Sequence, residues 1–320
     1  MPLSEAKAKR LKSLSTPDGI IAALAIDQRK SMRRMIADAA GKPIEQITDA
    51  QLIEFKSAVT QALTPHASAV LLDPEYGIEA ASKRAPGCGL LIAYEMDGYE
   101  NPRPHKMLAL RPELSVSRIR DLGADGVKIL LTYTPFEDQA ANDAKHALIE
   151  RIGAECEALD MPFFLEPVGY DTQGADPKSC EYARLKPEIV IRSMEEFSKP
   201  VYKVDILKVE FPVNAAYVDA AYTRLEALDI FRRADKSTNL PYIYLSAGVS
   251  MEQFKEQLNL AAESGACYCG VLCGRATWQE GAAEYARGGL SALSAWLTDE
   301  GVPKMKALNQ CLKPARSWRN

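Results

Sequence analysis

Histidine is scarce in this 320-residue sequence, and its scarcity limits the chemistry that the chain can perform. The three histidines, His66, His105 and His146, are far apart and form no H-x-x-x-H pattern. Catalytic zinc ions are commonly held by two or three histidines, so these isolated imidazoles are a poor basis for a metal site. We therefore expect neither a metal nor another cofactor, because a metal-dependent reaction would lack its ligands.

Cysteine pairs with the spacing of a metal site are also missing. Of the seven cysteines, Cys267, Cys269 and Cys273 cluster in sequence, but not as C-x-x-C. Strand periodicity puts these three on one face, which predicts buried free thiols. Disulfides are rare in reducing compartments, and this odd count of thiols is typical of a cytoplasmic protein.

The chain has no excess of basic residues and no long apolar run. Its net charge of -4 and its pI near 5.6 provide no general electrostatic basis for binding nucleic acid or an acidic membrane. No apolar run approaches the roughly 18 to 20 residues of a membrane span. The N-terminal segment MPLSEAKAKRLKSLS lacks the apolar core of a secretory signal. A hydrophobic content of 47% with 26% charged residues is that of a soluble globular protein.

What the chain does contain is a regular alternation of short apolar runs and helical stretches. The apolar runs of strand length are residues 20–28, 69–75, 89–95, 126–133, 163–170, 204–212, 242–248 and 270–275. Helical spacing lies between most of them, as at residues 51–63, 144–159 and 251–265, the last of which ends on a glycine suited to a C-cap. Eight strands in β-then-α order predict an α/β protein with a (β/α)8 TIM barrel.

The competing architecture is a doubly wound open sheet. Its G-x-G-x-x-G fingerprint does not follow the first predicted strand. Helical patterns at residues 4–14 and 289–313 flank the predicted barrel, and no linker-like segment divides the chain. We therefore expect a single (β/α)8 domain over residues 1–320, with N- and C-terminal helical extensions.

The predicted sixth strand, VDILKVEFPVN at residues 204–214, raises a question because two charged residues interrupt its apolar centre. Side chains alternate across a strand, so Lys208 and Glu210 share one face and the apolar residues around them share the other. The charged face could be solvated, could carry a structural ion pair, or could line a pocket. In a (β/α)8 barrel, chemistry takes place at the carboxyl ends of the strands, which is where the polar residues of this sequence collect.

Polar residues interrupt or follow the predicted strands near their carboxyl ends. They are Asp27, Gln28 and Arg29, Asp73 and Glu75, Glu95, Lys128, Glu166, Lys208 and Glu210, Ser246, and Arg275. A lysine becomes a nucleophile when a dry pocket or a neighbouring cation lowers its pKa, and it can then form a Schiff base with a carbonyl. Lys208 is such a candidate, with Lys128 as the neighbouring cation and Glu166 on the intervening strand as a proton shuttle.

Two turns near the end of the predicted barrel are suited to an anion. SAGVS, after the seventh strand, presents Ser246 and Gly248, whose small size lets backbone N–H groups approach an anion ahead of a helix N-terminus. CGRAT, at the eighth strand, adds Gly274 for close approach and Arg275 as a forked donor. Barrel enzymes often bind phosphate with the loops after strands 7 and 8, so a phosphorylated substrate is predicted.

In several segments the chain resembles the tagatose 1,6-bisphosphate aldolase family, which are class I aldolases of the barrel type. The segments are ALAIDQRKSMRRM, LLDPEYG, CGLLIAYE, FFLEPVGYD, VDILKVEFPVN, PYIYLSAGVS and GVLCGRATW, and the resemblance covers nearly the whole chain. It implies reversible cleavage of a ketohexose 1,6-bisphosphate into dihydroxyacetone phosphate and glyceraldehyde 3-phosphate. The substrate implied is tagatose 1,6-bisphosphate, or an epimer such as fructose 1,6-bisphosphate.

The same resemblance implies a role for each candidate residue. Lys208 is expected to form the Schiff base and Glu166 to be the acid/base carboxylate. Asp27 and Lys128 are expected to position the hydroxyl and carbonyl groups of the substrate. The further expected substrate and phosphate contacts are Gln28, Arg29, Ser246, Gly274 and Arg275. Barrels of this size commonly self-associate, so a homo-oligomer is also expected.

The sequence departs from the family pattern directly after Glu166. It reads PVGYD at residues 167–171, where the family has a bulkier apolar pair before Tyr-Asp, and this change could reshape the pocket at the stereocentres of the sugar. A related group of barrel aldolases that cleaves sulfofructose 1-phosphate shares the DQR, LEPV and KVE elements and is the nearest enzymatic alternative. A phosphosugar-sensing regulator on the same fold is the non-enzymatic alternative. The complete set of lysines and carboxylates described above favours the enzyme.

Overall fold

Short apolar segments pair side by side into a closed parallel barrel. The computed structural model describes residues 3–96, 98 and 101–319. Over these residues, each strand pairs with the next strand along the chain, and β1 closes the ring by pairing with β8. The strands are β1 Ile21–Ile26, β2 Ala69–Leu72, β3 Gly89–Ala93, β4 Gly126–Thr132, β5 Phe163–Val168, β6 Ile206–Val209, β7 Tyr242–Leu245 and β8 Gly270–Cys273. The predicted (β/α)8 TIM barrel is therefore confirmed.

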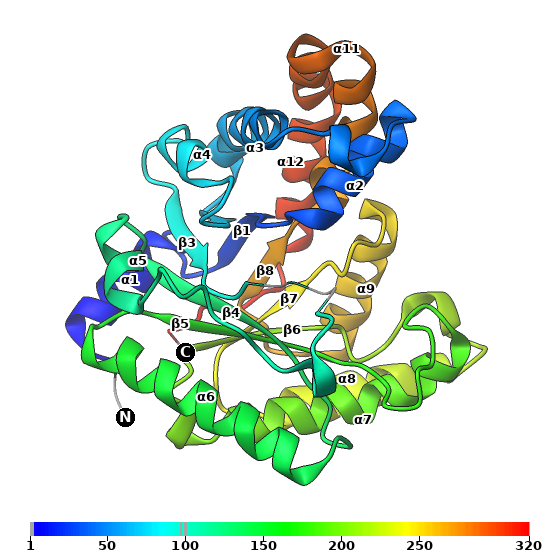
Figure 1. Ribbon diagram of the computed structural model, residues 1–320. Coiled ribbons are helices and arrows are strands. Elements are labelled where there is room, and N and C mark those ends of the chain that lie inside the picture. Colours follow the sequence, from blue (N-terminus) through cyan, green and yellow to red (C-terminus); the bar gives the residue numbers. More distant parts are fainter. Residues whose placement is uncertain (1–2, 97, 99–100, 320) are drawn as a thin grey trace.

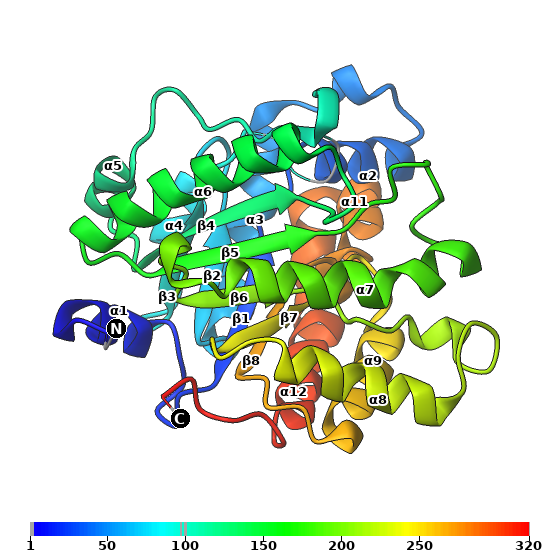
Figure 2. The ribbon, with the colours of Figure 1, turned by 90° about the horizontal axis from the view of Figure 1, so that it is seen from below.

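Most of the helices join successive strands and cover the outside of the barrel, while others precede β1 or follow β8 (Figure 1). They are α1 Glu5–Ser13, α2 Lys30–Ala40, α3 Asp49–Leu63, α4 Ile78–Ser82, α5 Val116–Asp121, α6 Gln139–Ala158, α7 Cys180–Phe197, α8 Arg224–Lys236, α9 Met251–Ser264, α10 Arg275–Trp278, α11 Gly281–Trp296 and α12 Val302–Cys311. Short 3-10 turns lie at Ile44–Gln46, Thr64–His66, Pro104–Lys106, Pro200–Tyr202 and Ala215–Tyr217, and the π-helical turn Leu297–Gly301 joins α11 to α12. Figure 2 shows the strands running in one direction, with α6 and α7 along their outer side.

The helices begin and end where local hydrogen bonds satisfy their free backbone groups. Thr48 and Gln51 form a capping box at the start of α3, and Ser250 and Gln253 form one at the start of α9. As expected, α9 ends at Gly265, whose φ of 82° lies in the left-handed region that glycine adopts without steric cost. Among the described residues, none of the helices combines the length and the apolar character that crossing a membrane requires.

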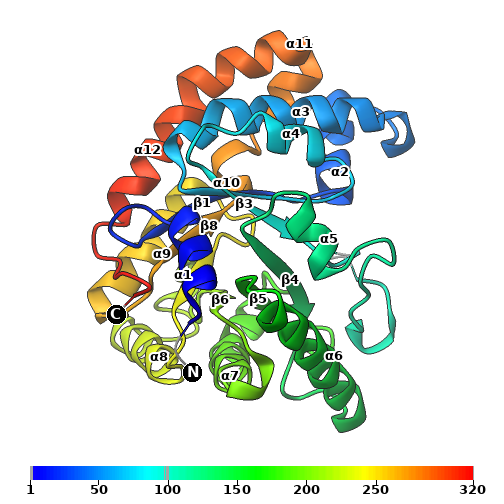
Figure 3. The same ribbon diagram turned by 90° about the vertical axis from the view of Figure 1, so that its left-hand side faces the viewer.

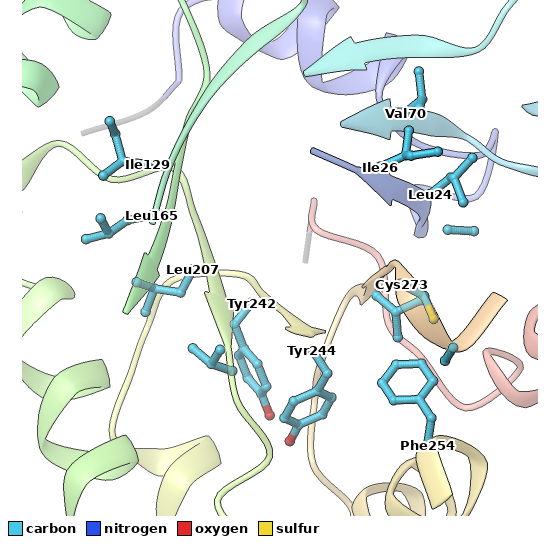
Figure 4. Packing of buried hydrophobic residues seen from close by; sticks show 14 of the residues in the cluster. Leu24, Ile26, Val70, Ile129, Leu165, Leu207, Tyr242, Tyr244, Phe254 and Cys273 are labelled. Carbon is cyan, nitrogen blue, oxygen red and sulfur yellow. The ribbon is translucent and has the colours of Figure 1, made fainter. Parts of the chain in front are cut away.

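The outward face of the strands packs against the helices. Alternation along β6 sends Leu207 and Val209 into this outer layer, where both are completely or almost completely buried. Figure 4 shows part of the layer, in which Leu207, Tyr244 of β7 and Phe254 of α9 are labelled. Because the apolar face of each strand is used here, the residues between them point into the barrel.

The inward face of the barrel has two different halves. Toward the amino ends of the strands lies an apolar layer that includes Ala23, Leu71, Leu91, Phe164, Ile206 and Ile243. Leu11 of α1 and Trp318 pack against this layer, and Figure 3 shows α1 lying across that end of the barrel. Two residues further along their strands, the inward positions carry Glu166 and Lys208 instead. The fold therefore places the charged residues near the carboxyl ends of the strands.

The predicted strands are all present, but every predicted run extends past the carboxyl end of its observed strand. The first predicted run, 20–28, contains β1, and the sixth, 204–212, contains β6. Asp27 and Glu210 therefore follow their strands instead of belonging to them, because the hydrogen-bonded ladder ends before them. The helical extensions are confirmed, with α1 at the start of the chain and α11 and α12 at its end.

One prediction about the cysteines is wrong. Cys269 packs inside the barrel, whereas Cys273 packs in the outer layer, so the two do not share a face. The cause is Gly270, which lies between them with a φ of 145° and interrupts the alternation of the strand. Only glycine fits there, because a Cβ atom would lie 2.0 Å from the Ile21 carbonyl oxygen. The three thiols are free, but only Cys269 and Cys273 are buried, whereas Cys267 is partly exposed.

Candidate active site

Lys208 points into the barrel, whereas Glu210 does not join it there. The Lys208 side chain is only 5% exposed, and its Nζ lies 2.7 Å from Oε1 of Glu166 on the neighbouring strand β5. Glu210 lies beyond the end of β6, where its Oε2 accepts a hydrogen bond of 2.8 Å from the Gly169 N–H. Its Oε1 lies 3.2 Å from Nζ of Lys186 on α7. The two charges of VDILKVEFPVN thus separate into a pocket lysine and a structural ion pair.

Lys128 of β4 lies at the centre of a cluster of carboxylates. Its side chain is completely buried, and its Nζ donates to Asp27 Oδ2 at 3.1 Å and to Glu95 Oε1 at 2.8 Å. Glu166 Oε2 lies 2.7 Å from the same nitrogen, so Glu166 bridges Lys128 and Lys208. Glu95 is held in turn, because its Oε2 accepts a hydrogen bond from the Leu130 N–H. The structure thus brings together Asp27, Lys128, Glu166 and Lys208, as the sequence predicted.

The charges in this cluster shift one another's protonation. Burial lowers the pKa of Lys208, and the positive charge of Lys128 lowers it further, although Glu166 opposes both effects. Burial would also lower the pKa of Lys128, but Asp27, Glu166 and Glu95 hold it well above its usual value. Burial would raise the pKa of Asp27, but Lys128 and Lys208 hold it well below its usual value. Lys128 therefore stays an ammonium, while Lys208 is the lysine that loses its proton more easily.

Three apolar side chains lie next to the charged cluster, on the side that faces the mouth of the barrel. Leu130, Val168 and Leu245 form a separate buried cluster. Leu130 and Val168 follow Lys128 and Glu166 by two residues, so they occupy the next inward positions toward the mouth. They add to the burial of the charges beneath them, and burial is the largest cause of the lowered pKa of Lys208.

A cavity of about 180 Å³ opens beside this cluster, between the carboxyl ends of β1, β3 and β8. Its lining residues are Asp27, Gln28, Arg29, Lys30, Ser31, Glu95, Met96, Gly98, Leu130 and Arg275. It brings four of the predicted site residues together with Glu95, which the sequence had marked only as a polar strand-end residue, and adds two that sequence reasoning did not select: Lys30 and Ser31. Lys30 and Ser31 stand in the first turn of α2, directly after Arg29, so a helix N-terminus was the available signal.

The turns after β7 and β8 pack against each other as a unit. Ala247 and Gly248 have consecutive positive φ angles of 48° and 77°. Gly248 leaves room for the guanidinium of Arg275, because a Cβ atom there would lie 2.6 Å from Arg275 Cζ. The Gly274 N–H donates to Ser246 Oγ at 3.4 Å. Ser246, Gly248, Gly274 and Arg275 thus lie together at the carboxyl ends of β7 and β8.

Two other predicted contacts differ in how the structure places them. Arg29 lines the cavity, but its guanidinium donates to the carbonyl oxygens of Glu95 (3.0 Å) and Met96 (2.6 Å), which follow β3. Gln28 lies close to Gly274, where a Cβ atom would come within 3.2 Å of Gln28 Nε2. Arg29 therefore supports the wall of the cavity, whereas Gln28 lies where the cavity meets the turn after β8.

Other polar residues at the strand ends are not part of this cluster. Asp73 pairs with Lys56 of α3, and Glu75 pairs with Arg111. The three histidines lie in separate contacts, and within the described part of the chain no three His, Cys, Asp or Glu side chains are grouped so as to hold a metal ion.

A buried lysine beside a carboxylate, at the carboxyl ends of the strands of a barrel, is typical of enzymes in which the lysine attacks a carbonyl carbon and forms an imine. The chain belongs to the DeoC/LacD family of aldolases, which it matches over residues 21–280. It is 47% identical over 325 residues to tagatose 1,6-diphosphate aldolase 2 of Enterococcus faecalis, a match that covers 99% of this chain and 97% of that protein.

Relatives in other bacteria are similar over comparable lengths. Tagatose 1,6-diphosphate aldolase of Listeria monocytogenes is 46% identical over 316 residues, which cover 97% of this chain and 92% of that one. Tagatose 1,6-diphosphate aldolase 2 of Streptococcus agalactiae is 44% identical over 328 residues, which cover 100% and 99% of the two chains.

Solved structures share the fold at much lower sequence identity. A Schiff base-forming fructose-1,6-bisphosphate aldolase superposes with a TM-score of 0.54 at 16% identity, over 90% of this chain and 97% of that one. Fructose-bisphosphate aldolase of Plasmodium falciparum superposes with a TM-score of 0.69 at 12% identity, over 99% and 97%. At such identities the likeness concerns the fold alone.

Proposed function

We propose that the protein is a class I aldolase that reversibly cleaves tagatose 1,6-bisphosphate into dihydroxyacetone phosphate and glyceraldehyde 3-phosphate, with residues 1–320 acting as one domain. The substrate is supported by relatives of 44–47% identity that carry the name tagatose 1,6-diphosphate aldolase. The observation that carries the chemistry is the 2.7 Å contact between Lys208 Nζ and Glu166 Oε1 inside the barrel.

The first half of the reaction forms an imine. Glu166 takes a proton from the Lys208 ammonium, and the neutral amine attacks C2 of the ketose. Proton transfers through Glu166 convert the former carbonyl oxygen into water, which leaves, and a protonated imine remains on Lys208. The lowered pKa of Lys208 favours this step, because only the unprotonated amine is a nucleophile.

The second half breaks a carbon–carbon bond. The C4 hydroxyl loses its proton, C4 becomes the aldehyde of glyceraldehyde 3-phosphate, and the electrons of the C3–C4 bond move into the imine to form an enamine. The enamine gains a proton at C3, and water then hydrolyses the imine to release dihydroxyacetone phosphate. We assign these proton transfers to Glu166, while Asp27 and Lys128 position the hydroxyl and carbonyl groups of the substrate.

The phosphate groups are assigned to the rim of the cavity. Arg275 supplies a forked cation, and Gln28, Ser246, Gly248 and Gly274 surround it with small or amide groups. Arg29 contributes by holding the backbone after β3. This arrangement favours a substrate with a phosphate near the carbon that Lys208 attacks.

Reductive trapping tests the proposal. Borohydride added together with dihydroxyacetone phosphate should inactivate the enzyme irreversibly and leave an adduct on Lys208 that peptide mass spectrometry locates. Borohydride alone should leave activity intact, and EDTA should not change the rate of cleavage. An adduct on Lys128, or full activity in the Lys208→Ala protein, would contradict the assignment.

A substrate panel tests the specificity. Tagatose, fructose, sorbose and psicose bisphosphates and sulfofructose 1-phosphate should be compared by kcat/KM, and tagatose 1,6-bisphosphate should be cleaved with the highest value. A preference for sulfofructose 1-phosphate would replace the proposed substrate by its nearest enzymatic alternative. Binding of phosphosugars without cleavage would indicate a phosphosugar-sensing regulator instead.

We also propose that the protein acts in the cytoplasm as a homo-oligomer. The seven unpaired cysteines support a reducing compartment. Light scattering of the purified protein tests the second statement, and a mass equal to the 35.2 kDa chain would contradict it.

A further inference from the structure

A buried ion pair formed by Lys56 and Asp73 lies next to the backbone around Asp27. Lys56 is in the middle of α3, and Asp73 is the first residue after β2, and neither side chain is exposed at all. Besides contacting Asp73, Lys56 Nζ donates to the carbonyl oxygens of Ile26 (2.6 Å) and Gln28 (2.8 Å). These two residues flank Asp27, so one ammonium group holds the backbone on both sides of a catalytic carboxylate.

The backbone at this point needs such support because it has left the barrel ladder. The last register pair between β1 and β2 is Ile26 with Leu72, and Asp27 lies beyond it. Asp73, which orients Lys56, is itself fixed, since its Oδ1 accepts hydrogen bonds from the N–H groups of Glu75 (3.0 Å) and Tyr76 (2.8 Å). The chain of contacts therefore runs from the β2 turn through Asp73 and Lys56 to the backbone around Asp27.

The charge of Lys56 acts in the same direction as its hydrogen bonds. Burial would raise the pKa of Asp27, and the positive charges of Lys128 and Lys208 overcome that effect. Lys56 adds a third positive charge that lowers the pKa of Asp27. An ionised Asp27 is the form that accepts the hydrogen bond from Lys128 at 3.1 Å.

We propose that Lys56, oriented by Asp73, is a positioning residue for the aldolase reaction: it holds Asp27 so that its carboxylate meets Lys128 and the substrate. The inference rests on the proposed function, because the substrate contact of Asp27 is part of that proposal. Lys56 is completely buried and contacts Asp73 and the backbone on both sides of Asp27. Its effect on catalysis is therefore transmitted through Asp27.

The opposite end of the barrel supplies a matched control. Lys7 of α1 and Asp205 form a buried pair with 2.8 Å between Nζ and Oδ2, and their side chains are 8% and 7% exposed. Asp205 also accepts a backbone hydrogen bond of 2.8 Å, from the N–H of Phe163. The two pairs thus have similar chemistry, but only the Lys56 pair adjoins the carboxyl ends of the strands.

The test compares two double variants, Lys56→Met/Asp73→Asn and Lys7→Met/Asp205→Asn. Both partners are changed together because removing one alone would leave an unpaired buried charge. We expect the first variant to lower kcat on the order of 10- to 100-fold with KM changed less than about threefold, as for a misplaced catalytic group. The second variant should keep kcat within about threefold. Unchanged kcat in a folded first variant, or equal losses in both, would overturn the inference.

A double-mutant cycle shows whether the effect passes through Asp27. Added to Asp27→Asn, the Lys56→Met/Asp73→Asn change should cost less than about threefold more, because its target is already lost. Added to Arg275→Ala, its cost should multiply in full. Full multiplication with Asp27→Asn would overturn the inference. Borohydride trapping separates this failure from a failure of the proposed function. If the wild-type protein is not trapped, the proposed function is contradicted. If the wild-type protein is trapped but the losses from Asp27→Asn and Lys56→Met/Asp73→Asn multiply in full, only the role of Lys56 is contradicted.

Discussion

The two halves of the barrel interior are built from the same strands but differ in what they contain. On β5, Phe164 packs in the apolar layer and Glu166, two residues later, bridges two lysines. On β6, Ile206 packs in the same layer and Lys208 follows it at the next inward position. On both strands, two residues therefore separate a side chain that stabilises the fold from one to which we assign chemistry.

The difference shows how the barrel makes a costly site tolerable. Removing ammonium and carboxylate groups from water is unfavourable unless they are paired and hydrogen-bonded. The half of the interior near the carboxyl ends of the strands meets this condition, because Asp27, Glu95 and Glu166 surround Lys128. The half near the amino ends of the strands offsets the remaining cost by burying apolar side chains, each of which contributes on the order of 1.5 to 3 kcal/mol to the stability of the fold.

The largest effect should come from Lys208→Ala. Loss of the nucleophile should lower kcat on the order of 10⁴- to 10⁶-fold, as when the central member of a catalytic group is removed. Steady-state kinetics with tagatose 1,6-bisphosphate measure the loss, and circular dichroism checks that the barrel is folded. Activity near that of the wild type would show that the charged half of the barrel interior does not perform the reaction through Lys208.

Glu166→Gln should have the next largest effect. The amide keeps the size of the side chain but can no longer exchange a proton, and general acid–base catalysis is typically worth about 10²- to 10⁴-fold in kcat. Apparent substrate affinity should change much less. A variant with almost normal kcat would transfer the proton shuttle to another group, with Glu210 or a substrate phosphate as the first candidates.

Arg275→Ala should have an intermediate effect that depends on the substrate. A charge-assisted hydrogen bond contributes roughly 1.5 to 3 kcal/mol, which corresponds to about 10- to 150-fold in kcat/KM for a bisphosphate. Arg275→Lys should recover only part of this loss, because an ammonium lacks the planar fork. A ketose without the contacted phosphate is the control, and an equal loss with that ketose would mean that Arg275 is structural.

Ile206→Ala should have the smallest effect on kcat and a large effect on stability. The side chain is completely buried in the apolar layer, so its truncation should lower the free energy of unfolding by about 2 to 5 kcal/mol. Below the unfolding transition, kcat should remain within about threefold of the wild-type value. Urea unfolding and steady-state kinetics measure the two quantities. A loss of kcat that exceeds tenfold in folded protein would show that the two halves are not separable.

The strands and most of the site could be predicted because their signals are local. Runs such as GVKILLT and ILKV show their period within a few residues, and parallel strands bring their carboxyl ends to one rim. Asp27, Lys128, Glu166 and Lys208 therefore could be expected at one place before any contact was known. Lys56 also left a local signal, since it lies on the buried face of α3 between Leu52 and Thr60, but its partners could not be inferred from it.

What the sequence by itself determined is the order of strands and helices and the rim on which the charged residues lie, because apolar periodicity operates over neighbouring residues. Only the tertiary structure decided which charges meet. Lys208 and Glu210 have the same parity in sequence, yet the ladder of β6 ends at Val209, and Glu210 instead accepts a hydrogen bond from the Gly169 N–H. Arg29 likewise donates to carbonyl groups that follow β3, far from it in the chain. Such partners depend on where each strand leaves the ladder and on how far each side chain reaches across the barrel, and neither is encoded locally.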